Sequence, residues 1–303
     1  MNTAARIALG TAQFGLDYGV TNRAGQLSEQ TVRAVLARAR EAGVQWLDTA
    51  AAYGAAEVVL GRLASPASGF RVCTKVVSAA DAADPVGGAQ RQFGQSLARC
   101  GRSRVDVLMV HDARQLLGAD GAALYRWLAA QKDAGRAAAI GASVYEGSEA
   151  VALTDRYALD WIQLPLSLLD QRALADGTLA RLKSRGVSVQ ARSVLLQGLL
   201  LADPTRLPAA FAPAQAPLAR VRAAAAACGM SVLDLALGFV ASVAEVDQIV
   251  LGVESPAQLD ECVRALGTPA KADWRDLACD ELAVLDPRRW PAGVRIVDVE
   301  AGR

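Results

Sequence analysis

The chain has 303 residues, a length that suits one α/β barrel with its loops, so we expect a single domain over residues 1–303. Its 32 Lys and Arg balance 31 Asp and Glu, and without a basic block we expect neither a nucleic-acid nor a membrane partner. The opening MNTAARIALG holds no long apolar stretch, and no apolar run elsewhere approaches the roughly 18 residues that span a bilayer. We therefore expect a cytoplasmic protein that binds a small molecule, while the oligomeric state stays open.

Short runs rich in Val, Ile and Leu alternate with longer amphipathic stretches along the whole chain. Eight such runs predict eight strands, the number that a closed parallel barrel requires, and the predicted fold class is an α/β (β/α)8 TIM barrel. The predicted strands cover residues 6–11, 44–49, 71–76, 105–111, 138–143, 159–164, 187–193 and 247–252.

The stretches between the strands predict helices with clear ends. Ser28 opens a helix predicted over 28–42, and Gly43 ends it. In the same way, glycines end predicted helices over 119–134 and 172–185. Residues 203–217 hold four of the 11 prolines and predict a loop over the barrel mouth. The tail from about residue 270 is expected to pack a last helix and an extended end on the barrel.

The five cysteines are scattered, odd in number and free of any C-x-x-C pair. This pattern argues against a disulfide framework and a zinc site, so we predict reduced, mostly buried thiols and no metal. They are Cys73, Cys100, Cys228, Cys262 and Cys279.

Four side chains with complementary chemistry fall at the ends of three successive predicted strands: Asp48, Tyr53, Lys75 and His111, the only histidine. Because the carboxyl ends of barrel strands meet at one face, one site can hold all four. Each alone has a structural explanation: Asp48 as a helix N-cap, Tyr53 as a rim aromatic, Lys75 as a strand-end lysine, His111 as a hydrogen-bonded histidine. Their coincidence at one mouth favours function.

Together these groups suit the reduction of a carbonyl. A tyrosine has a pKa near 10 and needs a nearby cation to become a stronger acid, so we predict that Lys75 lowers the pKa of Tyr53 by about one to two units. Asp48 would keep Lys75 charged, and His111 would orient the carbonyl.

Eight segments of the chain resemble the aldo-keto reductase family. They are LGTAQFG (9–15), LDTAAAYG (47–54), TKV (74–76), VLMVHD (107–112), IGAS (140–143), IQL (162–164), RSVLLQGLL (192–200) and VLGVESPAQLDEC (250–262). The resemblance implies a barrel that binds NADP or NAD without a Rossmann domain, and the chain lacks the G-x-G-x-x-G motif of such a domain. It also implies NAD(P)H-dependent reduction of an aldehyde or ketone, with Tyr53 as the general acid.

The resemblance also implies cofactor contacts along the barrel mouth. It places Ser143 and Gln163 at the nicotinamide carboxamide, but Val144 stands where relatives have Asn, Arg192 where many have a stacking aromatic, and Cys262 where they usually have Asn. The implied contacts are Thr11, Asp48, Ser143, Gln163, Arg192, Ser193, Leu195, Gln197, Gly198, Gly252, Glu254, Ser255, Gln258, Glu261 and Cys262.

Several points stay open at this stage. Glu254, with no basic residue over 252–263, disfavours a 2′-phosphate, whereas the family favours NADP, so we expect NADP or NAD with NADP preferred. Asp17 and Tyr18 lie beside the substrate or form a structural turn, and Asp112 and Arg114 are rim candidates. Alternative functions are a non-catalytic nicotinamide-binding regulatory subunit, a Schiff-base aldolase using Lys75, or sugar oxidation by the same chemistry in reverse.

Overall fold

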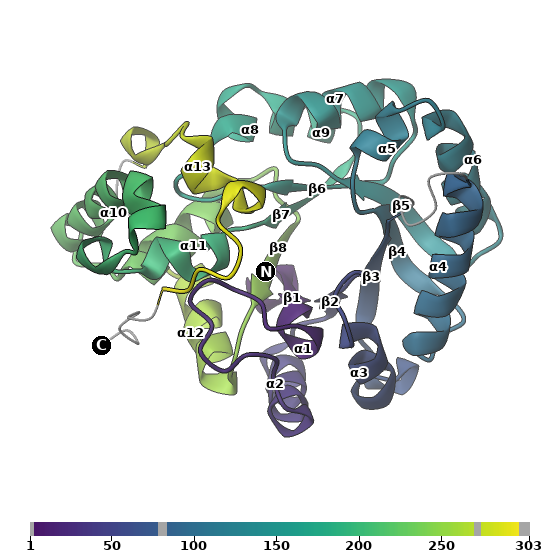
Figure 1. Cartoon of the computed structure of the whole chain (residues 1–303), viewed down its shortest axis with the longest axis horizontal. Helices are drawn as coiled ribbons and strands as arrows, with labels where there is room; N and C mark the ends of the chain where they lie inside the picture. Colours follow the sequence, from purple (N-terminus) through teal and green to yellow (C-terminus); the bar gives the residue numbers. More distant parts are fainter. Residues whose placement is uncertain (1–2, 78–83, 270–273, 297–303) are drawn as a thin grey trace.

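Eight parallel strands close into a barrel in chain order, so that each strand pairs with the next and β8 pairs with β1 (Figure 1). The computed structural model describes residues 3–77, 84–269 and 274–296. The predicted (β/α)8 barrel is confirmed. Its strands are β1 Ile7–Gly10, β2 Trp46–Asp48, β3 Arg71–Val76, β4 Val105–Val110, β5 Ala137–Ser143, β6 Trp161–Pro165, β7 Ser188–Arg192 and β8 Gln248–Gly252.

The core has two parts, because alternate strand residues point to opposite faces of the sheet. A small cluster of Ala8, Trp46, Cys73, Val107 and Met109 fills the barrel interior. A much larger apolar layer lies between the outer face of the sheet and the helices. Buried polar side chains on the strands include Asp48, Gln163, Gln190 and Gln248, and others such as Glu57 lie on helices.

A ring of helices surrounds the sheet. The predicted start and stop of α2 are confirmed: Ser28 accepts a hydrogen bond from the Thr31 backbone N–H, and Gly43 takes a left-handed φ of 88°. The longer helices are α2 Glu29–Ala42, α3 Ala56–Leu63, α4 Pro85–Arg99, α6 Gly121–Asp133, α7 Gly147–Arg156, α9 Thr178–Ser184, α10 Gln215–Ala227, α11 Val232–Ser242 and α12 Pro256–Leu266, and the shorter ones are α1 Ala12–Gly15, α5 Arg114–Leu117, α8 Arg172–Ala175 and α13 Leu282–Leu285.

Two predicted segments differ from the structure. The single helix expected over 172–185 is wrong, because Gly177, with φ at 77°, separates α8 from α9. The stretch 203–217 is not a plain loop: it forms the 3-10 turns η5 Pro204–Arg206 and η6 Ala209–Ala214, and then opens α10. Pro217 fits there because the first helical turn needs no backbone N–H donor.

The C-terminal segment packs on the barrel and reaches the loop that follows β1 (Figure 1). Trp290 contacts Phe211 of η6, with ring centroids 5.4 Å apart. Further on, the Ile296 N–H donates to the Val20 carbonyl at 2.7 Å, and Arg295 pairs with Asp17 at 2.6 Å. The C-terminal segment is thus joined to the loop after β1.

All five cysteines are free thiols, as predicted; four are buried, and Cys228, at the end of α10, is half-buried. Within residues 3–77, 84–269 and 274–296, no three His, Cys, Asp or Glu side chains form a group that could hold a metal ion. In the same ranges no single helix is long and apolar enough to cross a membrane, although the bent pair 209–227 and 232–242 meets that test jointly.

Candidate active site

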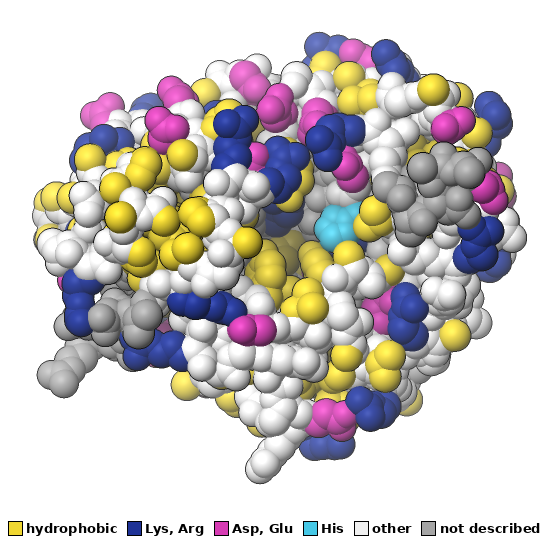
Figure 2. Space-filling view, viewed as in Figure 1, with side chains coloured by type: hydrophobic (Ala, Val, Ile, Leu, Met, Phe, Trp, Pro, Cys, Tyr) yellow, Lys and Arg dark blue, Asp and Glu magenta, His cyan; other side chains and the backbone are white. Residues whose placement is uncertain are grey.

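The carboxyl ends of the strands surround a hollow, and the single histidine lies at its edge (Figure 2). Asp48 is the last residue of β2, Lys75 lies one residue before the end of β3, and His111 directly follows β4. The His111 N–H donates to the Val76 carbonyl at 2.8 Å, which fixes the start of its loop.

Lys75 and Asp48 form a buried ion pair inside the mouth. The Lys75 Nζ lies 2.6 Å from Asp48 Oδ1 and donates to the Thr49 carbonyl at 3.0 Å. Burial, the largest single effect, lowers the pKa of Lys75, but Asp48, Tyr53 and Cys73 together raise it by more, so the net pKa is raised and the ammonium stays charged. Asp48 is not a helix cap, because α3 begins at Ala56 after Ala55.

Tyr53 stands between this pair and His111. The Lys75 Nζ is 5.4 Å from the centre of the Tyr53 ring, and the rings of Tyr53 and His111 meet edge to face at 5.7 Å. Burial raises the pKa of Tyr53, Lys75 lowers it, and Asp48 raises it again, with a net raised pKa. Lys75 thus acts in the predicted direction, but the prediction left out desolvation of the phenolate, which is larger, so the pKa of Tyr53 is raised rather than lowered in the protein alone.

The loop that carries Tyr53 is held against α1 by two glycines. A Cβ on Gly15 would lie 2.0 Å from the Tyr53 carbonyl oxygen, and Gly54 adopts a φ of 54°. The Tyr53 N–H also donates to the Ala50 carbonyl at 3.0 Å. Close backbone approach thus fixes where the phenol stands.

His111 is uncharged in this environment. Burial, then Lys75 and Arg192, lower its pKa to about 3. Its Nδ1 atom is buried and has no hydrogen-bond partner among the described residues. A neutral imidazole can donate a hydrogen bond to a carbonyl oxygen without adding a charge to the site.

A chain of buried amides leads from Asp48 across the barrel interior. Gln163 Nε2 donates to Asp48 Oδ2 at 2.9 Å and to Gln190 Oε1 at 2.5 Å, and Gln190 donates to Gln248 at 2.8 Å. Ser143 donates to Gln163 Oε1 at 3.2 Å, and Thr11 donates to the Asp48 carbonyl at 3.0 Å. Both N–H groups of Gln163 are occupied, so its oxygen is the atom left to accept from a carboxamide.

The loop after β7 has an unusual backbone. Ser193, Leu196 and Gln197 have positive φ values of 57°, 49° and 54°, the non-glycine residues with positive φ in the described ranges. Gly198 follows with φ at 92°, and a Cβ there would lie 1.8 Å from Thr21 Oγ1. Such conformations cost free energy and cluster at ligand-binding loops, which fits the extended cofactor that the sequence implies; Leu195 precedes the same turn.

The segment after β8 caps α12. Ser255 accepts from the Gln258 N–H, and the Gln258 side chain accepts from the Glu254 N–H at 2.7 Å. Gly252 and Glu261 are exposed, whereas Cys262 is buried at 5% exposure with a pKa raised to about 12 by burial, so a contact of Cys262 with the adenosine end finds no support in its placement.

A basic residue reaches this end from elsewhere in the chain. Burial raises the pKa of Glu254, and Arg295 lowers it from close by. The sequence does not indicate a role for Arg295 here, because Arg295 lies more than 30 residues beyond the 252–263 segment and no local pattern connects the two.

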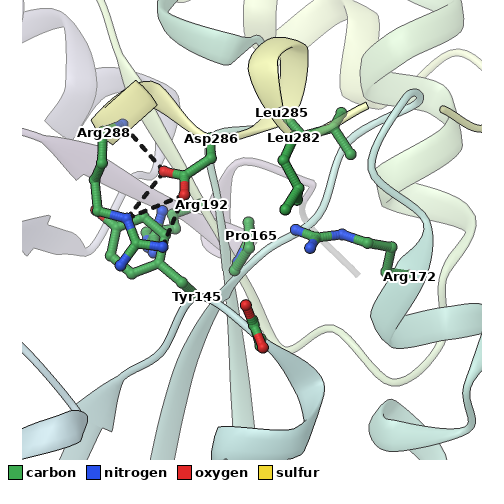
Figure 3. A pocket seen from close by; sticks show the side chains of 9 residues that line it. Tyr145, Pro165, Arg172, Arg192, Leu282, Leu285, Asp286 and Arg288 are labelled. Carbon is green, nitrogen blue, oxygen red and sulfur yellow. Dashed lines mark hydrogen bonds and ion pairs between the residues drawn. The ribbon is translucent and has the colours of Figure 1, made fainter. Parts of the chain in front are cut away.

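Arg192 also has surroundings that the sequence did not indicate. Its guanidinium donates to the Val144 carbonyl at 2.8 Å and lies 4.1 Å from the centre of the Tyr145 ring, while Arg288 from the tail lies 3.5 Å from the same ring. Arg288 pairs with Asp286 (Figure 3).

Among the rim candidates, the Tyr18 side chain is 38% exposed, and desolvation of its hydroxyl raises its pKa. Asp17 instead pairs with Arg295, and Asp112 pairs with Arg114 at 2.6 Å. These two carboxylates are therefore engaged in ion pairs at the edge of the mouth.

The family model described as the Aldo/keto reductase family matches residues 6–275. The chain belongs to the aldo-keto reductase family. This aldo-keto reductase has the fold of solved structures at low identity. One is an aldo-keto reductase from Bacillus halodurans in its holo form (20% identity, TM-score 0.72, 94% of this chain and 95% of that one). Another, from Pseudomonas aeruginosa, is described as a candidate aldo-keto reductase (19%, 0.64, 86% and 89%). No curated protein sequence matches the chain.

Membership of the family supports a carbonyl oxidoreductase in general, and the family generally uses NAD(P)H. The neutral His111, the backbone of the β7 loop and the side-chain-free Gly252 at the end of β8 are compatible with such a cofactor at this mouth.

Proposed function

We propose that this aldo-keto reductase reduces an aldehyde or ketone, sugar-like carbonyl compounds included, to the alcohol with NADPH or NADH. The observation that carries the proposal is the buried Lys75–Asp48 pair beneath Tyr53, with His111 at the edge of the same ring. Bound NAD(P)H would supply the hydride for the carbonyl carbon.

Residues of the chain donate the proton to the carbonyl oxygen, stabilise the phenolate that remains and orient the carbonyl. Tyr53 holds its proton at neutral pH and gives it to the oxygen as negative charge develops there. Lys75 stabilises the phenolate that remains, Asp48 keeps Lys75 charged and in place, and neutral His111 donates a hydrogen bond that orients the carbonyl.

The test is the Tyr53→Phe variant, which keeps the ring and removes the acid. With generic aldehydes and NADPH or NADH, we expect kcat to fall by about 10²- to 10⁴-fold, the usual contribution of a general acid, while NADPH still binds. Absorbance at the nicotinamide band measures turnover, and quenching of protein fluorescence measures binding. Equal turnover in both proteins would refute the assignment.

The same measurements separate the alternatives. Tight NADPH binding without turnover of any carbonyl in a broad panel would indicate a regulatory subunit. A Schiff-base aldolase is disfavoured because the raised pKa of Lys75 leaves its amine protonated and poorly nucleophilic. Borohydride trapping with a carbonyl substrate is therefore expected to leave Lys75 unlabelled.

We infer a preference for NADPH over NADH. The family favours NADP, and Arg295, which pairs with Asp17, also lowers the pKa of Glu254 and so adds positive charge near the adenosine end. Dissociation constants of the two cofactors check this directly, and tighter binding of NADH would overturn it. Arg295→Gln should weaken NADPH binding more than NADH binding.

A further inference from the structure

Arg192 is a charged residue at the barrel mouth whose hydrogen bonds go to neutral groups. Its Nη2 donates to the Val144 carbonyl at 2.8 Å and its Nη1 to Ser193 Oγ at 3.2 Å. Both acceptors are neutral, and among the residues that the structure describes no carboxylate oxygen lies within 4.0 Å of Arg192. A guanidinium has five N–H groups, so donors remain for a further acceptor.

The neighbouring charges are already paired. Arg192 lines a narrow hollow, with a cavity volume of only about 10 Å³, together with Arg172 and Arg288 (Figure 3). Arg172 pairs with Asp170 at 2.8 Å, and Arg288 with Asp286 at 2.8 Å. Glu146 also lines the hollow, but its carboxylate accepts a backbone N–H of the first turn of α7. Glu146 keeps its negative charge, but among the described residues Arg192 is the arginine of this hollow that no carboxylate contacts within 4.0 Å.

The guanidinium is also held in place. The Arg192 Cζ lies 4.1 Å from the centre of the Tyr145 ring, and the Arg288 Cζ lies 3.5 Å from the same centre. A half-buried guanidinium that is already ordered loses little side-chain entropy when it binds a planar or tetrahedral oxyanion.

Arg192 is near the reacting groups as well. It donates to the carbonyl of Val144, the residue after Ser143, and Ser143 is linked through Gln163 to Asp48 by hydrogen bonds of 3.2 and 2.9 Å. The charge of Arg192 also lowers the pKa of His111. A molecule whose carbonyl meets Tyr53 and His111 would thus present its adjoining atoms to the Arg192 side of the mouth.

We propose that Arg192 binds an oxyanion carried by the carbonyl substrate, a carboxylate or a phosphate, so that anionic aldehydes and ketones are preferred over neutral ones. This inference rests on the proposed function. The same chemistry is offered by the pyrophosphate of the cofactor, and the experiment distinguishes the two sources.

The first arm compares two aldehydes of matched shape, 4-carboxybenzaldehyde and its neutral amide, 4-formylbenzamide. We expect kcat/KM to favour the carboxylate by about tenfold or more, the usual effect of one charge-assisted hydrogen bond. Arg192→Gln should bring this ratio close to one, and Arg192→Lys should retain part of it. A wild-type ratio of one, or a ratio unchanged in Arg192→Gln, would overturn the proposal.

Arg114→Gln is the matched control. Arg114 is also an arginine at the rim of the mouth, but it is exposed and already paired with Asp112. Its removal changes the net charge by the same amount, so the ratio between the two aldehydes should stay within about twofold. An equal fall in this control would show a general charge effect and contradict a specific contact of Arg192.

The second arm measures NADPH binding by fluorescence in wild type and Arg192→Gln. A rise in Kd above about tenfold with an unchanged aldehyde ratio would assign Arg192 to the pyrophosphate and overturn the substrate contact. If no aldehyde turns over, the proposed function fails, and calorimetry with 4-carboxybenzyl alcohol and its amide decides the oxyanion site. Binding of the carboxylate that requires Arg192 supports it, and equal binding of both compounds overturns it.

Discussion

Tyr53 and His111 show how the mouth controls charge at single residues. Both groups stay neutral in the protein alone: burial raises the pKa of Tyr53 and lowers that of His111. The site therefore keeps the proton on the phenol and keeps the imidazole a hydrogen-bond donor, while Lys75 remains charged. A proton would leave Tyr53 only when the oxygen of the substrate becomes negative.

His111 offers a direct measurement because it is the only histidine. In protein without a histidine tag, the imidazole carbon signal in an NMR spectrum belongs to His111 alone. We expect it not to titrate between pH 9 and about pH 5, since burial, Lys75 and Arg192 disfavour the imidazolium. A midpoint near the unperturbed value of about 6.5 would contradict the buried neutral state.

The same shift affects stability. The folded pKa lies below the unfolded value of about 6.5, so the unfolded chain binds the proton more readily, and stability is lost as pH falls from about 6.5 toward the folded pKa. Through His111 this loss approaches about 1.4 kcal/mol per pH unit at most. Urea unfolding at pH 6.5 and 4.5 should show a smaller loss in His111→Gln than in wild type.

Among the elements, the loop after β7 carries the strain. Positive φ values at Ser193, Leu196 and Gln197 persist because the loop is held by the N-terminal segment, where Thr21 Oγ1 donates to the Gln197 carbonyl at 3.3 Å. The same N-terminal segment holds Ile296 and Arg295 of the tail. The loop after β1 therefore contacts both the loop after β7 and the C-terminal segment at the barrel mouth.

Gly198→Ala tests this loop. A Cβ would meet Thr21 Oγ1 at 1.8 Å and the φ of 92° would be strained, so we expect unfolding free energy to fall by more than about 1–2 kcal/mol and NADPH affinity to fall. Gly229→Ala is the control: its φ is 64°, but a Cβ there meets nothing within 4 Å. Gly229→Ala should lower the unfolding free energy only by the cost of a positive φ at alanine, and it should bind NADPH with the wild-type affinity. Equal NADPH affinity in the two variants would separate the loop from the cofactor.

Local sequence patterns indicated the elements well where one signal dominated. The β-branched strand runs and the Ser28 and Gly43 ends of α2 were of this kind. The break between α8 and α9 was missed because a glycine inside a helical pattern is compatible with both a continuous helix and a turn, and only the left-handed φ of Gly177 decides.

At the scale of the whole molecule, the ion pair in the mouth links activity to stability. Lys75→Met should lower the unfolding free energy by about 3–5 kcal/mol, because Asp48 is left charged and buried without its partner. Lys75→Met with Asp48→Leu should recover much of that loss and remain inactive. Chemical denaturation and turnover assays measure both. A double variant as unstable as the single one would contradict the uncompensated charge as the cause.

The topology also explains which site residues the sequence could indicate. Asp48, Lys75, His111, Ser143 and Gln163 follow from the rule that barrel strands end at one face. The contacts of Arg192 with Tyr145, and of Arg295 near Glu254, join segments that are far apart in the chain. Such contacts have no periodicity or spacing that a single sequence reveals.

The uneven burial of the thiols gives the chain a natural attachment point. Four of the five cysteines are shielded from solvent, and Cys228 at the end of α10 is the partly open one. A maleimide dye should therefore attach at one position without any engineered cysteine. The dye would sit at the C-terminal end of α10, one helix length from η6, whose Phe211 contacts Trp290, and its emission would report changes around that end of the helix.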